Sequence, residues 1–172
     1  MRHPNQISAM KKILFLFAIV LFLPNHFYAQ TAADASAMFA KSYDYMNDFE
    51  KILTSSQVKT LNDFLKSSET KTTSKILIVT TSSIAPYTDL SDYSLALDKY
   101  MLSQLKIDTS ILIVISKQLR QIQVQGVEKV RSKMSDQELK DIITTYVVPE
   151  LKKGDYYKGL ELGVKQLLKK IE

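Results

Sequence analysis

The sequence contains no cysteine, no tryptophan and only two histidines, and these absences limit its chemistry. Both histidines, His3 and His26, fall in a segment that we expect to be removed on export. The mature chain therefore cannot form a cysteine or histidine nucleophile, a Ser-His-Asp triad, or a zinc or copper site of thiolate or imidazole. Carboxylates, hydroxyls, lysines and two arginines remain, so any bound metal would be an oxygen-preferring cation such as Ca²⁺ or Mg²⁺.

Residues 1–29 have the features of a secretory signal peptide. Lys11 and Lys12 precede an apolar run, Ile13–Leu23, and the segment ends at the small residue Ala29. A basic start, a short apolar core and a small residue at the cut are typical of an export signal. The apolar run spans only about 16 Å as a helix, roughly half a bilayer core, so we expect no permanent membrane anchor in the mature chain. This predicts a periplasmic or extracellular protein.

The basic charge of the chain belongs mostly to that leader. Removing Arg2, Lys11 and Lys12 lowers the basic count from 23 to 20 against 18 acidic residues, so the net charge falls from +5 to +2. The remaining lysines are interspersed with acidic residues, and we expect no nucleic-acid binding. Residues 30–43 are small and polar at their start and are expected to form a flexible tether. Residues 44–172 then have the size of a single domain.

The stretch from Asp108 to Glu128 predicts two strands joined by a tight turn. Ile111–Ile115 is too short for a helix core and suits a strand covered on both faces. Gln121–Gln125 alternates glutamine with isoleucine or valine, which indicates a strand with one wet face. The five residues between them are few enough to turn the second strand back antiparallel to the first. Asp108 and Glu128 should then lie at the same edge of the sheet.

Ile76–Val79 predicts a second buried strand, with a predicted helix before it and another after it. A helix capped by Asp89 or Ser91 connects it to Ile111–Ile115, and this crossover makes the two strands parallel. Two capping boxes, Thr54–Gln57 and Ser135–Glu138, predict helix starts. We expect the first of these helices to run to about Ser68.

The sequence after the second capping box predicts two more helical segments. Leu139, Ile142, Ile143, Tyr146 and Val147 should form the buried face of the first, and Pro149 should end it. Asp155 caps the last helix, in which Gly159 and Gly163 are expected where the helix lies very close to the sheet.

These elements predict a small α/β layer structure. Two buried parallel strands and an antiparallel edge strand would carry about four helices on both faces. The sequence does not decide whether the sheet contains a fourth strand.

The order of these parts resembles a TPM domain, a family of exported or membrane-tethered α/β domains. The resemblance covers most of the mature chain and rests on Asn47-Asp48, Ile76–Val79, Asp108, Gln123–Glu128, Ser135-Asp136, Val148-Pro149, Gly154–Tyr156, Gly159-Leu160 and Gly163. It implies a three-layer α/β/α, Rossmann-like fold without the nucleotide-binding fingerprint. It also implies acid phosphatase activity, divalent-metal binding, or a part in the assembly or repair of membrane protein complexes.

The chain departs from the family pattern in two respects. It has Asp108-Thr109-Ser110 where the family often has Asp-Asn-Gly, and it keeps only Gly126 of a Gly-x-Gly. Many relatives continue into a membrane helix, whereas this sequence stops at Glu172. The first departure bears on the family's site and the second argues against permanent anchoring.

Asp108 and Glu128 are the main candidates for a metal or catalytic site. Neighbouring antiparallel strands lie about 4.8 Å apart, so residues flanking the same end of a hairpin can share one cation. Ca²⁺ takes six to eight oxygens, which Ser110 or Thr109 hydroxyls and loop carbonyls would supplement. The plainer alternative is that Asp108 caps a turn and Glu128 is solvated.

Asp48 and Asp136 are weaker candidates as metal ligands. Asp136 lies at a helix start, where a carboxylate is stabilised by free amides and by the helix dipole. The role of Asp48 rests on the resemblance alone. The hydroxyl run Thr80–Ser83 follows a parallel strand, where ligands of open α/β sheets bind, although an ordinary polar loop explains it as well.

Two functions from different classes follow. The first is a non-catalytic module of the cell envelope that binds a divalent cation or a membrane-protein partner. The second is a metal-dependent acid phosphatase acting on phosphomonoesters, with Asp108 as metal ligand or nucleophile and Glu128 beside it. A phosphatase of this kind needs a cation or arginine clamp on the transferred group.

Overall fold

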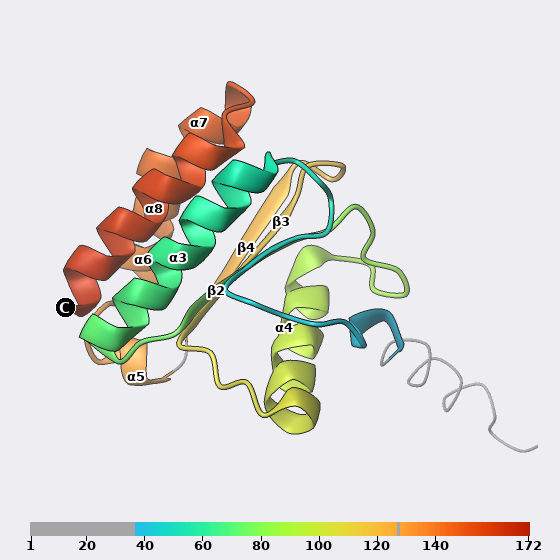
Figure 1. Cartoon of the computed structure of the whole chain (residues 1–172), viewed down its shortest axis with the longest axis horizontal. Helices are drawn as coiled ribbons and strands as arrows, with labels where there is room; N and C mark the ends of the chain where they lie inside the picture. Colours follow the sequence, from blue (N-terminus) through green and yellow to red (C-terminus); the bar gives the residue numbers. More distant parts are fainter. Residues whose placement is uncertain (1–36, 127) are drawn as a thin grey trace, which may run out of the picture. The chain divides into compact units, whose positions relative to one another are not determined.

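A computed structural model describes residues 37–126 and 128–172 (Figure 1). The chain divides into two units, Met1–Ala37 and Met38–Glu172, and the second unit contains all the elements discussed below. The predicted signal peptide, residues 1–29, lies outside the described residues.

The second unit is built on a four-stranded mixed sheet in the order β1-β2-β3-β4. The strands are β1 (Met46–Asp48), β2 (Ile76–Thr80), β3 (Ile111–Ser116) and β4 (Gln121–Gly126). β1, β2 and β3 are parallel, and β4 pairs antiparallel with β3. The predicted parallel pair and the hairpin are therefore confirmed. β1 is the strand that the sequence left open, because three residues are too few to show a period of two.

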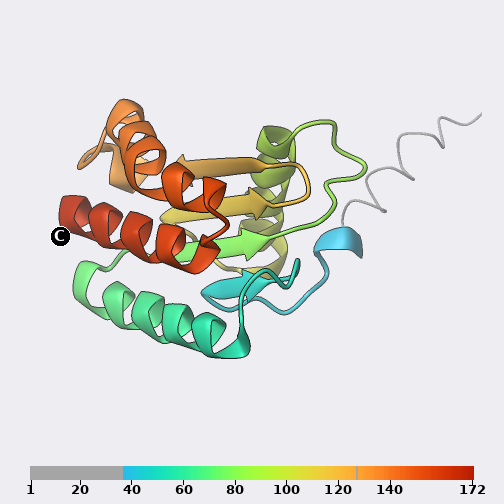
Figure 2. The same ribbon diagram turned by 90° about the horizontal axis from the view of Figure 1, so that it is seen from above.

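Helices cover both faces of this sheet (Figures 1 and 2). One layer contains α3 (Ser55–Thr72), α6 (Asp136–Ile142), the π-helical segment η2 (Ile143–Val147), α7 (Val148–Lys152) and α8 (Tyr156–Ile171). On the other face lies α4 (Leu90–Tyr100), continued by the π-helical segment η1 (Met101–Leu105). A short helix, α5 (Glu128–Arg131), follows β4. The predicted α/β/α layering is confirmed.

Alternate residues of the central strands supply two separate cores. In β3, Ile111, Ile113 and Ile115 face the layer of α3 and α8. Leu112 and Val114 face α4 on the other side. All five are almost fully buried, which is the pattern expected of a strand covered on both faces.

The predicted helix caps are confirmed, but α3 is longer than predicted. Thr54 and Ser135 both form complete capping boxes, and Asp89 and Asp155 accept hydrogen bonds at the starts of α4 and α8. α3 continues to Thr72 rather than ending near Ser68. The Thr72 hydroxyl donates to the Ser68 carbonyl within the helix, so the polar residues there continue the helix instead of breaking it.

The prediction that Pro149 ends a helix is wrong. The chain remains helical from α6 through η2 and α7 to Lys152. Proline lacks the N–H that would bond to the preceding turn, but it lies in the first turn of α7, where that donor is not needed. The wider π turn of η2 also rotates the helix face, and Tyr146 is 38% exposed instead of buried.

The two glycines of α8 approach a helix, not the sheet as predicted. A Cβ atom on Gly163 would lie 2.4 Å from Cγ2 of Val147 in η2, and one on Gly159 would lie 3.1 Å from the Val147 carbonyl oxygen. The missing side chains therefore allow α8 to pack directly on η2 and α7.

The compact unit also begins earlier than the expected domain start at residue 44. Phe39 is only 2% exposed and belongs to the core beneath α4. Its ring lies 5.3 Å from that of Tyr93 and 5.7 Å from that of Tyr100, measured between centroids. The later part of the expected tether, residues 30–43, is thus part of the packed domain.

Candidate functional site

The predicted pair Asp108 and Glu128 lies at the edge where the parallel strands begin. Ile111 pairs with Gly126 at the end of the β3–β4 ladder, so the segments just before β3 and just after β4 are neighbours. Glu128 is the first residue of α5. The common edge is therefore as predicted. The Glu128 side chain lies outside the described part of the structure, so the approach of the two carboxylates stays a prediction.

The hydroxyls beside Asp108 make bonds within the domain. Ser110 Oγ accepts the backbone N–H of Lys75 at 3.1 Å, and Thr109 Oγ1 donates to Asp98 Oδ1 at 2.6 Å. Both residues are at least nine-tenths buried. They join the start of β3 to β2 and α4, and the Ser110 hydroxyl oxygen already accepts one backbone N–H.

Asp48 is not part of the Asp108 edge. It ends β1 at the opposite, carboxyl edge of the parallel strands. Its carboxylate accepts the N–H groups of Ile52 and Leu53 at 3.1 and 2.8 Å and the hydroxyl of Thr80 at 2.7 Å. These three bonds fix the loop between β1 and α3, so the described role of Asp48 is structural.

Asp136 lies apart from both. It is the first residue of α6, its side chain is 73% exposed, and Arg131 Nε lies 3.5 Å from its Oδ1. Among the side chains that the structure describes, which do not include that of Glu128, three or more acidic groups do not gather at any point where they could hold a metal ion. The five predicted ligands therefore do not form a single described cation site.

The free edge of β4 is a further candidate site, which the sequence alone does not indicate. β4 is the last strand of the sheet and its side chains are mostly half-buried. In β3, Ile111 N–H donates to Lys75 O and Ile115 O accepts from Thr81 N–H, so these odd-numbered residues bond toward β2. Leu112, Val114 and Ser116 must bond toward β4, because peptide groups alternate in direction along a strand.

It follows that β4 has a row of peptide groups directed away from the sheet. The partners of Leu112, Val114 and Ser116 are Gln125, Gln123 and Gln121, so these glutamines complete the ladder. The N–H and C=O groups of Ile122, Val124 and Gly126 then point outward. The described residues give no hydrogen-bond partner to these outward groups of Ile122 and Val124.

A groove of about 700 Å³ runs along this edge. On the side of α6 and η2 it is lined by apolar residues that include Val124, Leu139 and Ile143. On the side of α4 it is lined by Gln123, Gln125, Asp98 and Leu95, and Leu95 is 60% exposed. The alternation of Gln121–Gln125 was the sequence signal for an edge strand, but the flanking helices could be known only from the tertiary structure.

The fold is a small three-layer α/β/α domain in which β4 is an open edge strand. A family model, the TPM domain, matches residues 46–170. The chain therefore belongs to the TPM domain family, as the resemblance in the sequence implied. Among curated proteins, none matches the chain. In the described residues, no helix combines the length and the hydropathy needed to cross a bilayer.

Three solved structures share the fold at low sequence identity. The N-terminal domain of a protein from P. gingivalis is 22% identical, with a TM-score of 0.64 over 78% of this chain and 85% of that one. BA42 from the psychrophilic bacterium Bizionia argentinensis is 17% identical, with a TM-score of 0.59 over 72% and 83%. The N-terminal domain of cg2496 from Corynebacterium glutamicum is 14% identical, with a TM-score of 0.56 over 77% and 83%.

Proposed function

We propose that this TPM domain is an exported module of the cell envelope that binds an extended segment of a partner protein along the free edge of β4. The observation that carries the proposal is the row of outward peptide groups at Ile122, Val124 and Gly126, lying in a groove between α4 and α6–η2. An added strand would satisfy these groups by main-chain hydrogen bonds, as in other cases of β-strand addition.

The two sides of the groove define the kind of segment that fits. Side chains of an added strand alternate between the two faces of the sheet. On one face they would meet Val124, Leu139 and Ile143, which favours apolar residues. On the other they would meet Gln123, Gln125 and the exposed Leu95, which favours amides or hydroxyls with a long apolar stem. The partner segment is thus expected to alternate apolar and polar residues over about five positions.

The experiment begins with a photoreactive residue in place of Leu95, which cross-links whatever lies in the groove in intact cells. The cross-linked segment is mapped and made as a peptide, and its affinity is measured by calorimetry. Val124→Pro and Leu95→Glu should each weaken binding at least tenfold. Proline at position 124 removes an N–H that points away from β3, so the β3–β4 ladder keeps its bonds while an added strand loses one.

The control is Val124→Thr, which retains the N–H and the β-branched shape and should bind within about threefold of the wild type. Amide hydrogen exchange at Ile122, Val124 and Gly126 should slow when the peptide binds. Binding without such protection, or with equal affinity in Val124→Pro, would show that the edge is not the site. A second copy of the chain is the other possible occupant of the β4 edge, and sedimentation of the free protein tests for it. If two copies pair through this edge, Val124→Pro should weaken the dimer.

A second candidate function is cation binding by Asp108 and Glu128. One observation favours it: both residues lie at the edge of the sheet where the parallel strands begin. A ligand that binds only the native state raises its stability. Millimolar Ca²⁺ or Mg²⁺ should then raise the melting temperature of the wild type and not that of Asp108→Asn. An equal shift in both proteins, or none in either, argues against this site.

The phosphatase alternative needs a clamp for the transferred group beside Asp108. Arg120 precedes β4 and lies at the other end of the hairpin, and Arg131 is directed to Asp136. Since neither arginine is placed as a clamp, we do not extend the proposal to catalysis, and the phosphatase stays a prediction from the resemblance.

A further inference from the structure

A hollow with a basic lining lies at the carboxyl edge of the parallel strands, and it adjoins the β4 groove at Ile122 and Val148. Its volume is about 1160 Å³, and it is formed by four segments: the β1–α3 loop, the loop after β2 at Ser82, the β3–β4 hairpin and the turn between α7 and α8. The edge beyond the carboxyl ends of parallel strands is where open α/β sheets usually bind ligands. Its basic lining residues are Lys51, Lys117, Arg120, Lys152 and Lys153.

The one acidic residue in the described lining, Glu50, is engaged with the backbone. Its two carboxylate oxygens accept the N–H groups of Lys117 and Gln118, both at 2.8 Å. These bonds tie the β3–β4 hairpin to the loop after β1. Glu50 therefore positions the basic hairpin, and its oxygens are already shared with two donors that are not lysine ammonium groups.

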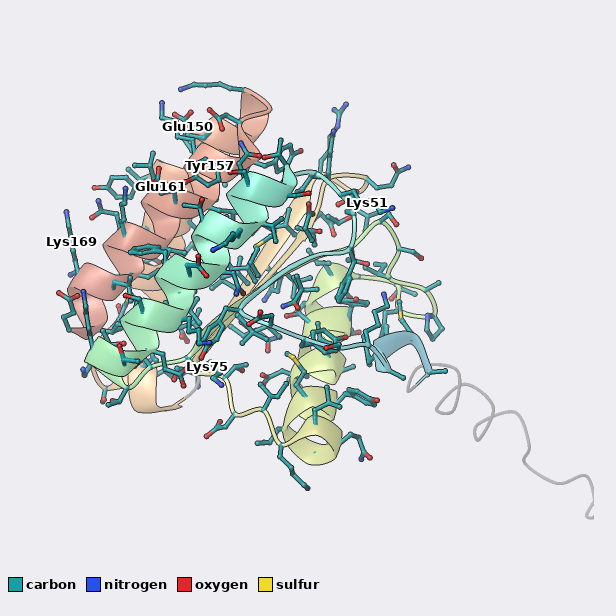
Figure 3. All side chains as sticks on the ribbon, viewed as in Figure 1. Lys51, Lys75, Glu150, Tyr157, Glu161 and Lys169 are labelled. Atoms are coloured by element: carbon teal, nitrogen blue, oxygen red, sulfur yellow. The ribbon has the colours of Figure 1, made fainter. Side chains whose placement is uncertain are left out.

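Two of the five basic groups have partners nearby. Lys153 Nζ lies 2.8 Å from Glu150 Oε1, which Figure 3 labels on α7. Lys117 Nζ lies 5.8 Å from the centre of the Tyr156 ring. For Lys51, Arg120 and Lys152, the described part of the chain shows neither an ion pair nor a side-chain hydrogen bond. Three like charges around one hollow repel each other, and an anion placed between them would relieve that repulsion.

The backbone at the rim is held in a conformation that side chains disfavour. Lys51 and Arg120 have φ values of 57° and 55°, and Gly154, also in the lining, has 85°. Left-handed backbone at residues other than glycine costs about 1–3 kcal/mol and tends to occur at functional sites. In Figure 3, Lys51 is labelled on the loop after β1, beside the hairpin end of the sheet.

We infer that this hollow binds a compact polyanion with at least two phosphate groups, held by Lys51, Arg120 and Lys152. Arginine offers a planar fork of donors that matches phosphate oxygens in pairs, and lysine adds point charges around them. The volume is that of a site for a small organic ligand, larger than one phosphate fills. This inference does not rest on the proposed edge-strand function, because Lys51, Arg120 and Lys152 lie outside the β4 groove, although Ile122 and Val148 line both the groove and the hollow.

The test uses inorganic pyrophosphate, titrated by calorimetry into the protein at 0.15 M NaCl, where weak surface attraction is largely screened. Binding should be one to one. The double variant Lys51→Gln/Arg120→Gln should weaken it at least tenfold, because it removes two charge-assisted contacts. The matched control is Lys66→Gln/Lys71→Gln on α3, which removes the same charge from exposed positions outside the hollow and should bind within twofold of the wild type.

Amide chemical shifts locate the ligand. Gln118 and Gly154 should respond to pyrophosphate, whereas Asp98 on α4 should not. A pair of phosphates carried by a lipid is tested with cardiolipin vesicles, because each cardiolipin headgroup contains two phosphates. Vesicle binding that pyrophosphate displaces assigns the phosphate to a lipid, and pyrophosphate binding without vesicle binding assigns it to a soluble ester.

Three outcomes would overturn the inference. These are no binding of either ligand, equal weakening in the two double variants, and shifts confined to residues outside the hollow. Thermal melts of both double variants check that each is folded, and a single substitution, Lys152→Gln, provides a further variant on a helix should the loop substitutions unfold the protein.

Discussion

Several carboxylates in this domain act as acceptors for backbone N–H groups. Asp48 and Glu50 fix two loops in this way, and Asp89 and Asp155 cap helices. Such bonds give a partner to backbone N–H groups that folding would otherwise leave without a hydrogen bond. An acidic residue next to a helix start therefore has a structural explanation before it has a functional one, and this applies to Asp136 as well.

Glu138 also accepts a backbone N–H, and its contacts change the pKa of its carboxyl group. Lys170 Nζ donates to its Oε1 at 2.8 Å, and the backbone N–H and hydroxyl of Ser135 lie 3.0 Å from its Oε2. These contacts, that with Lys170 first, lower the pKa of Glu138 from 4.5 to about 2. The folded protein thus holds the ionised form more strongly than the unfolded chain does.

This pKa predicts a specific pH dependence of stability. Because the folded pKa is depressed, the contribution of Glu138 to the free energy of unfolding is complete above pH 4.5 and is lost as the pH falls toward 2. Urea unfolding of Glu138→Gln should show lower stability than wild type at pH 7 and a smaller further loss between pH 4.5 and 2.5. Lys170→Gln should raise the pKa of Glu138 in an NMR titration. Parallel stability curves for the wild type and Glu138→Gln would contradict the prediction.

α8 packs closely on η2 at its glycines. A Cβ atom on Gly163 would lie 2.4 Å from Cγ2 of Val147, which is 2% exposed and β-branched. Such a side chain has little rotamer freedom in a helix, so it cannot swing aside at low cost.

Gly163→Ala should therefore destabilise the protein by about 1–3 kcal/mol through overpacking. In the background of Val147→Ala the obstructing methyl group is gone, and the same substitution should cost little or even gain from the higher helix propensity of alanine. Denaturant unfolding of the four proteins gives the coupling between the two sites. Equal costs of Gly163→Ala in the two backgrounds would show that this contact does not limit the packing.

The elements that the sequence predicted are those with a repeated local signal. The five apolar residues of β3, the alternation in β4 and the capping boxes at Thr54 and Ser135 each depend on neighbouring residues alone. β1 has no such signal because it is only three residues long, and Pro149 does not end the helix because the π turn before it depends on how η2 packs against α8. Likewise, Asp108 and Glu128 could be placed at one edge from the hairpin, whereas the basic hollow joins four distant segments and has no local signature.

For the whole second unit, the two faces of the sheet are covered unequally. α3, α6, α7 and α8 cover one face, whereas α4 and η1 cover the other with help from the segment around Phe39 (Figure 2). Phe39 closes the second core by contacting Tyr87, Tyr93 and Tyr100, with ring centroids 6.1, 5.3 and 5.7 Å away. Phe39, which lies 37 positions before the first strand that the sequence predicts, Ile76–Val79, thus completes a core.

This arrangement predicts where the domain can be shortened. A protein that begins at residue 44 loses Phe39 and opens the core beneath α4, and Phe39→Ala in the longer protein removes the same ring. Both should lower the free energy of unfolding by about 3–5 kcal/mol, the usual cost of deleting a buried phenylalanine side chain. Phe39→Leu should cost clearly less, since it refills most of the volume. Chemical unfolding of proteins that begin at residues 30 and 44 makes the comparison, and equal stabilities would mean that residues 37–43 do not contribute to the core.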